Sequence, residues 1–135
     1  MKKIKPLIQQ VLTDLEVTHF PMRSKDGGYL EFNTAMTLPC CLVEEEIKIS
    51  PTTDGRGFEV PIMFYLIDTF GLDNDMIWDI QNVLFDKAQE IVAALKINTD
   101  GLVLTMPKEY IYQHNLTNFT DCGVSFEITF RFSKC

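Results

Sequence analysis

The chain has 135 residues, of which 46% are hydrophobic, 23% are charged and 11% are aromatic. This composition is typical of a globular protein and excludes general disorder. Twelve Lys and Arg residues against nineteen Asp and Glu residues give a net charge of -7, which disfavours nucleic-acid binding, although an acidic wall can still line a passage for DNA.

The N-terminal segment has the spacing of an amphipathic helix. Apolar residues recur every three or four positions and so share one helix face: Ile4, Leu7, Ile8, Val11, Leu12 and Leu15. Polar residues interrupt the segment, so it lacks the apolar core of a secretory signal, and no stretch approaches the roughly 20 apolar residues of a membrane span. We therefore expect a cytosolic protein that forms one domain over residues 1–135.

The next segments indicate strands. Residues 17–22 are extended, and a turn at residues 25–28 precedes another extended stretch, so this region can form a small hairpin of its own. Residues 34–43 are apolar on both faces, as in a strand covered on both sides. Pro39 lacks a backbone donor, which indicates a sheet edge or a bulge within that strand.

A long hairpin is predicted after this strand. Residues 52–57 read Thr-Thr-Asp-Gly-Arg-Gly, and Asp-Gly suits the positive φ angles of a hairpin turn. The return strand, residues 58–68, alternates between two faces. One face holds Phe58, Val60, Ile62, Phe64 and Leu66, and the other holds Glu59, Pro61, Met63, Tyr65 and Ile67.

The strongest helix signal begins after the capping residues Asp73-Asn-Asp. Its apolar stripe comprises Ile77, Ile80, Val83, Leu84, Ala88, Ile91, Val92 and Leu95. Trp78 is expected in the core, with a role as an interface anchor as the alternative.

The C-terminal part is predicted to be β structure. Short strands are expected over residues 102–106 and 110–114, and residues 115–121 form a loop. The final strand, from Gly123 onwards, alternates apolar residues with Ser125, Glu127, Thr129, Arg131 and Ser133, so it closes the core and leaves a polar face. These elements predict an α+β fold: a single mixed, mostly antiparallel β-sheet with a long hairpin, packed by an N-terminal helix and a longer central helix.

No grouping of residues announces a reaction. A nucleophile beside a base, paired carboxylates, a phosphate-binding glycine loop and metal-ligand spacing are all missing from the sequence. His19 and His114 are far apart, and a metal site at the cysteines would need one of them. Cys40, Cys41, Cys122 and Cys135 are expected to be buried small hydrophobes. We predict no catalytic residue, no cofactor and no metal, and so no enzyme.

Three charged regions are candidates for a subunit interface. Glu44, Glu45 and Glu46 form either a solvated strand end or an acidic patch that orients a neighbouring subunit. The other candidates are Asp54 and Arg56 at the hairpin tip and Glu127 and Arg131 on the polar face of the final strand. Changing Glu127 and Arg131 is expected to disturb assembly before folding.

The order of these elements resembles the tail terminator proteins of long-tailed bacteriophages and the related neck and head-tail connector proteins. The resemblance covers residues 4–15, the strand Leu38-Pro-Cys-Cys-Leu-Val, and residues 58–68, 73–95 and 123–132. It implies a virion protein that forms a homo-oligomeric ring, a hexamer or a dodecamer, assembled in the bacterial cytoplasm. The implied partners are tail tube, connector or portal proteins, with DNA only passing through the lumen.

Two other functions stay open. One is a small-molecule-binding or enzymatic α+β domain whose site lies between the long helix and the sheet, with Tyr110, Tyr112, His114 and Asp121 as its polar groups. The other is a regulatory or antitoxin-like protein that binds a specific non-virion partner.

Overall fold

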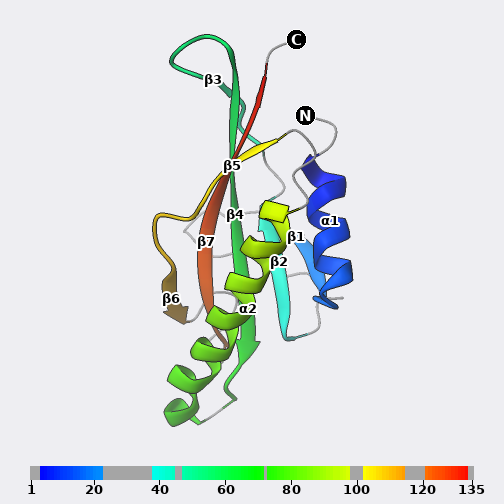
Figure 1. Ribbon diagram of the computed structural model, residues 1–135. Coiled ribbons are helices and arrows are strands. Elements are labelled where there is room, and N and C mark those ends of the chain that lie inside the picture. Colours follow the sequence, from blue (N-terminus) through cyan, green and yellow to red (C-terminus); the bar gives the residue numbers. More distant parts are fainter. Residues whose placement is uncertain are drawn as a thin grey trace.

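The fold is one mixed β-sheet with two helices on the same face (Figure 1). The computed structural model describes residues 4–22, 38–44, 47–71, 73–97, 102–114 and 121–133. In chain order the elements are α1 (Ile4–Asp14), β1 (His19–Met22), β2 (Cys40–Glu44), β3 (Ser50–Pro51), β4 (Gly57–Thr69), the 3-10 helix η1 (Asn74–Met76), α2 (Ile77–Ile97), β5 (Val103–Thr105), β6 (Ile111–His114) and β7 (Asp121–Ser133). The predicted α+β architecture is confirmed.

Strands β4 and β7 form the centre of the sheet. They pair antiparallel along their whole length, from Gly57 opposite Ser133 to Thr69 opposite Asp121. On the other side of β4 lie β2 and then β1, which runs parallel to β2, while β5 and β6 both pair with the far side of β7. Because the last strand is hydrogen-bonded on both sides, the core closes only with the C-terminal segment, as its alternation predicts.

The main core lies between the helices and one sheet face. Alternate residues of the central strands are buried there: Val60, Ile62, Phe64, Leu66, Val124, Phe126, Ile128 and Phe130. The helices add Ile4, Ile8, Val11, Leu12, Leu84, Ala88, Ile91, Val92 and Leu95. Phe64 and Phe126 are direct cross-strand partners with stacked rings, 5.1 Å between centroids. The predicted helix α1 is confirmed, and of the two faces predicted for β4 the one with Val60, Ile62, Phe64 and Leu66 packs against the helices.

A second apolar cluster lies on the opposite face, across β1, β2 and β4. Its buried members are Cys40, Leu42 and Ile67. Cys41 belongs instead to the main core, so the two-faced apolar pattern of this strand is confirmed. The sheet-edge reading of Pro39 is wrong, because β2 lies between β1 and β4. Pro39 precedes the first paired residue, Cys40, so its missing N–H removes no ladder bond.

Helix α2 confirms its predicted cap but not all of its predicted face. The Asp73 side chain accepts a hydrogen bond from the Asp75 N–H at 3.1 Å, and η1 leads directly into α2. Trp78 and Val83 are 65% and 68% exposed, so their placement in the core is wrong. Gln81 is buried instead. Successive residues are about 100° apart around a helix, so a face centred on the buried leucines leaves Val83 outside.

The strands that flank the central pair are both interrupted at one level of the sheet. From the last paired residue of β2 to the first of β3 the chain covers seven positions, whereas the facing stretch of β4 covers five. From β5 to β6 it covers six positions, whereas the facing stretch of β7 covers four. The bounding pairs are Val43–Phe64 and Ser50–Glu59 on one side, and Thr105–Thr129 and Ile111–Ser125 on the other. Extra residues of this kind bend a strand and increase its twist.

Beyond these interruptions the sheet continues as a narrower extension, which we call the distal arm (residues 47–60, 103–105 and 129–133). Its β3–β4 hairpin projects beyond both helices (Figure 1). The turn is the one predicted, with Gly55 at φ 70°. The outgoing strand β3 is only two residues long, whereas its return partner β4 has thirteen. Neither described helix is long and apolar enough to cross a membrane.

Of the other predictions, those for β1, β5 and β6 are confirmed within a residue or two. β1 pairs in parallel with β2, which is not the pairing of a local hairpin. The predicted turn at residues 25–28, the stretch after it and the start of the strand predicted from residue 34 lie outside the described residues.

Candidate assembly surfaces

The tip of the distal arm carries two predicted interface residues, Asp54 and Arg56, and both are exposed. Asp54 Oδ1 accepts hydrogen bonds from Thr52 Oγ1 at 2.5 Å and from the Arg56 N–H at 3.0 Å. The bond from Thr52, followed by that from Arg56, lowers the pKa of the Asp54 carboxyl. The carboxylate is therefore engaged in holding the turn, while the Arg56 side chain is presented to solvent.

Arg131 and Glu127 lie on the helix-free face of β7. The Arg131 guanidinium donates to a carboxylate oxygen of Glu59, its direct partner on β4, and both side chains are partly exposed. Such an exposed pair contributes about 0–1 kcal/mol to stability. Glu127 is exposed opposite Met63. The predicted wet face is not continuous, since Ser125 is only 1% exposed.

A shallow pocket of about 230 Å³ surrounds Glu127 on this face. It lies beside β7 at the interruption between β5 and β6, and Lys108 and Glu109 contribute its other charges. The Ser125 hydroxyl is buried beside it without a hydrogen-bond partner among the described residues. The charges of both signs make this a polar contact surface rather than an apolar one.

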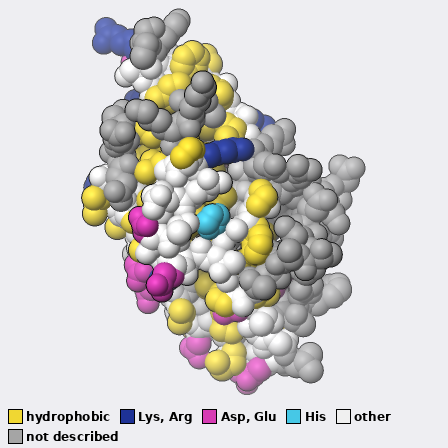
Figure 2. All heavy atoms as spheres, turned by 90° about the vertical axis from the view of Figure 1, so that its right-hand side faces the viewer, with side chains coloured by type: hydrophobic (Ala, Val, Ile, Leu, Met, Phe, Trp, Pro, Cys, Tyr) yellow, Lys and Arg dark blue, Asp and Glu magenta, His cyan; other side chains and the backbone are white. Residues whose placement is uncertain are grey.

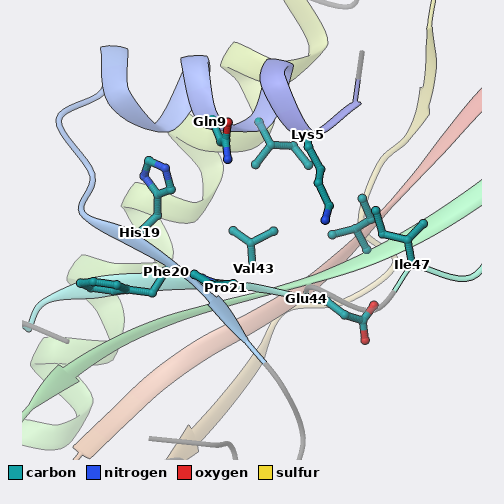
Figure 3. A pocket seen from close by; sticks show the side chains of 10 residues that line it. Lys5, Gln9, His19, Phe20, Pro21, Val43, Glu44 and Ile47 are labelled. Atoms are coloured by element: carbon teal, nitrogen blue, oxygen red, sulfur yellow. The ribbon is translucent and has the colours of Figure 1, made fainter. Parts of the chain in front are cut away.

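Glu44 stands beside a second pocket, of about 270 Å³, between α1 and the strands β1 and β2. Lys5 and Gln9 reach from α1 toward the strands, and the His19 ring turns toward the helix (Figure 3). His19 Nδ1 lies 3.1 Å from the carbonyl oxygen of Val17, which can only accept, so Nδ1 carries the proton in the neutral ring and Nε2 is the acceptor. Glu45 and Glu46 lie outside the described residues.

The side of the molecule that carries α1 shows hydrophobic side chains on both sides of a surface histidine, and acidic side chains gather in its lower half (Figure 2). The rim of the pocket beside α1 combines a cation, an imidazole and a carboxylate, from Lys5, His19 and Glu44. Sequence reasoning missed it, because its residues come from three elements and share no motif.

The four polar residues predicted for a small-molecule site do not converge on either pocket. Tyr110 stacks edge-on against Phe85, with 5.0 Å between centroids, and its partial burial raises its pKa. Tyr112 also contacts Phe85, and its hydroxyl donates to Asn82 Oδ1 at 2.9 Å. Asp121 is fully buried and His114 is exposed. Aromatic rings thus fill the space between this part of α2 and the sheet.

The outer side of α2 is a surface that sequence reasoning did not single out. Residues 73–86 contain four aspartates and no lysine or arginine. Helix geometry aligns Asp79 and Asp86 to within about 20°, with Val83 on one flank and Trp78 on the other. The Trp78 ring leans on Tyr112, 5.3 Å between centroids. We call Asp79, Asp86, Trp78 and Val83 the acidic helix face. Its charge bias is visible in the sequence, whereas the exposure of Trp78 is not.

The cysteines are the buried thiols that the sequence predicts, within the described part of the chain. Cys40, Cys41 and Cys122 are buried and unbridged, and Cys135 lies outside the described residues. Desolvation, then the nearby carboxylates of Asp68 and Asp121, raises the pKa of Cys40 to about 12 and that of Cys122 to about 11. No group of described His, Cys, Asp and Glu side chains could hold a metal ion.

No protein-family model matches the sequence, and no curated protein gives a significant match. Function is therefore inferred from the fold and from these surfaces.

Proposed function

We propose that this chain is a ring-forming structural protein of a bacteriophage virion, either a tail terminator or a head-tail connector. In this role it caps the tail tube or joins it to the head, and DNA passes through the ring. The observation that supports this best is the projecting distal arm on a sheet that two helices cover from one side (Figure 1). A β extension that reaches beyond its own core is suited to contacting a neighbouring subunit.

The surface properties agree with this role. Large apolar side chains are exposed on α2 and on the distal arm, among them Trp78, Val83 and Val103, and exposed apolar surface of this kind marks interaction sites. The net charge of -7 suits a lumen that must let DNA slide without binding it tightly. The proposed partners are further copies of the chain, in a hexamer or a dodecamer, and tail tube, connector or portal proteins in the virion.

Mass photometry and negative-stain electron microscopy of the purified protein test the proposal. We expect a closed ring with a central opening, alone or once tail tube or connector subunits are added. A species that is strictly monomeric and also fails to associate with those subunits would contradict it.

The pocket beside α1 supports a second candidate function, small-molecule binding. It is close in size to the smallest ligand sites, which begin near about 300 Å³, and it has Lys5, His19 and Glu44 at its rim. A thermal-shift screen with metabolites and metals checks this, because a bound ligand raises the melting temperature by mass action. A shift that His19→Ala and Lys5→Met both abolish would favour binding, whereas a shift retained in both variants would place the ligand elsewhere.

A further inference from the structure

We propose that copies of this chain associate head to tail, with the distal arm of one copy docked on the acidic helix face of the next. The proposal rests on the proposed function only in assuming that the chain assembles with itself. It adds which surfaces meet, and it gives Trp78 of α2 the interface role that the sequence analysis kept as the alternative.

The distal arm is a surface of positive character. Lys48 and Arg56 are exposed on it. Of the other charges on the arm, Arg131 pairs with Glu59, whereas Asp54 holds the turn and keeps its negative charge, so three cations stand against two carboxylates. Exposed apolar side chains accompany these cations, with Ile49 at 49% and Val103 at 61% exposure. The arm thus offers two cations and an apolar contact to a partner.

The acidic helix face is its complement in charge and in polarity. Aspartates in a first helical turn stabilise the positive end of the helix dipole, which accounts for Asp75 and Asp79. That effect fades within one turn, so it does not account for Asp86. Nor does it account for the exposure of Trp78 and Val83. A large aromatic side chain surrounded by residues that contribute little binding energy themselves is the usual arrangement of an interface hot spot.

The two surfaces cannot meet within one molecule. The hairpin of the arm and the first turn of α2 lie at opposite ends of the fold (Figure 1). A contact between unlike surfaces of two copies is heterologous, and such contacts either close into a ring or continue as a filament. A chain with a net charge of -7 repels its copies at long range, so a basic arm also gives the approaching subunit its orientation.

A mixing experiment tests the head-to-tail geometry. The arm variant is Lys48→Glu/Arg56→Glu, and the helix variant is Trp78→Ala/Val83→Asp. Each variant keeps one intact surface and lacks the other. We therefore expect each variant alone to self-associate at least about 30-fold more weakly than wild type. A mixture of the two should form 1:1 dimers and nothing larger by mass photometry. All four positions are exposed, so both variants should stay folded, and the helix variant should melt slightly earlier because it loses the contact of Trp78 with Tyr112.

Charge exchange within one chain tests the pairing itself. Combining the arm variant with Asp79→Lys/Asp86→Lys should restore self-association to within about tenfold of wild type, since both signs are reversed together. The matched control for Arg56→Glu alone is Lys96→Glu, which makes the same change in net charge outside both docking surfaces and should assemble normally. An arm variant that self-associates as strongly as wild type would overturn the proposal.

The outcomes separate this proposal from the proposed function. A wild-type ring that persists in both variants would overturn the head-to-tail contact and leave the ring function standing. A wild-type chain that stays monomeric at every concentration tested would overturn the head-to-tail contact, while its association with tail tube or connector subunits would still support the virion role.

Discussion

Replacing Phe126 by alanine tests whether the centre of the β4–β7 pair carries the stability of this protein. Phe126 is 1% exposed and faces the helices. Its ring stacks on that of Phe64 with an interplanar angle of 2°, and Tyr110 approaches with a centroid distance of 5.6 Å. Removing the ring therefore opens a cavity and also breaks an aromatic pair.

The expected cost follows from these contacts. A Phe→Ala change in a core costs about 3–5 kcal/mol. An aromatic pair is worth about 0.5–1.5 kcal/mol beyond the area that it buries, so we expect the upper half of that range. Total stability for a domain of this size is about 5–15 kcal/mol, so the variant should lose about a third of it or more.

Phe132 supplies the matched control, because it is also stacked on a phenylalanine of β4. Its ring lies 5.5 Å from that of Phe58, but in the distal arm, where both residues are only partly buried. We expect Phe132→Ala to cost no more than about 2 kcal/mol. The measurement is urea unfolding followed by far-UV circular dichroism, at a concentration where all variants share one oligomeric state. Equal costs for the two variants would refute the separation of core from arm.

Three further outcomes are expected. Gln81→Leu should destabilise the monomer by about 1–3 kcal/mol in the same assay. The reason is that Gln81 Nε2 donates to a carbonyl oxygen on β6 at 2.8 Å and to one on β7 at 3.4 Å. An unchanged stability would mean that water molecules take over these hydrogen bonds in the variant. Gly57→Ala should lower the melting temperature, since a Cβ there would lie 2.4 Å from the Phe132 carbonyl oxygen; an unchanged melting temperature would show that the arm can shift. The raised pKa values of Cys40 and Cys122, about 12 and about 11, mean that the folded state holds these protons more tightly than the unfolded state. The contribution of these two thiols to stability should therefore be constant below about pH 9 and fall above it. Melting temperatures between pH 8 and 10.5 check this, and Cys122→Ala should flatten the fall.

Most of the elements could be predicted because their signals are local. The alternation in β4 and β7 and the three-to-four spacing in α1 depend only on backbone period, so the helix-facing residues of these elements follow from the sequence. The hairpin turn is equally local, since Gly55 alone meets the requirement for a positive φ.

The interface residues could be predicted only in part. Asp54 and Arg56 lie at the tip as expected, but the engagement of Arg131 by Glu59 depends on a register between strands 72 positions apart. The sequence leaves Trp78 with two roles, in the core or as an interface anchor, and its 65% exposure excludes the first. Its actual position depends on how α2 is rotated against the sheet, which Gln81 and the buried leucines decide together.

The sequence alone determined the type and the approximate ends of each main element and the apolar faces of α1 and β7, because hydrophobic period and turn chemistry act over a few residues. Only the tertiary structure decided that β1 runs parallel to β2, that both flanking strands are interrupted at one level, and that an acidic helix face and a basic arm lie at opposite ends. These features depend on packing between segments far apart in the chain. Local conformational propensities differ by a few tenths of a kcal/mol per residue, whereas burying an apolar side chain is worth about 1.5–3 kcal/mol, so burial decides.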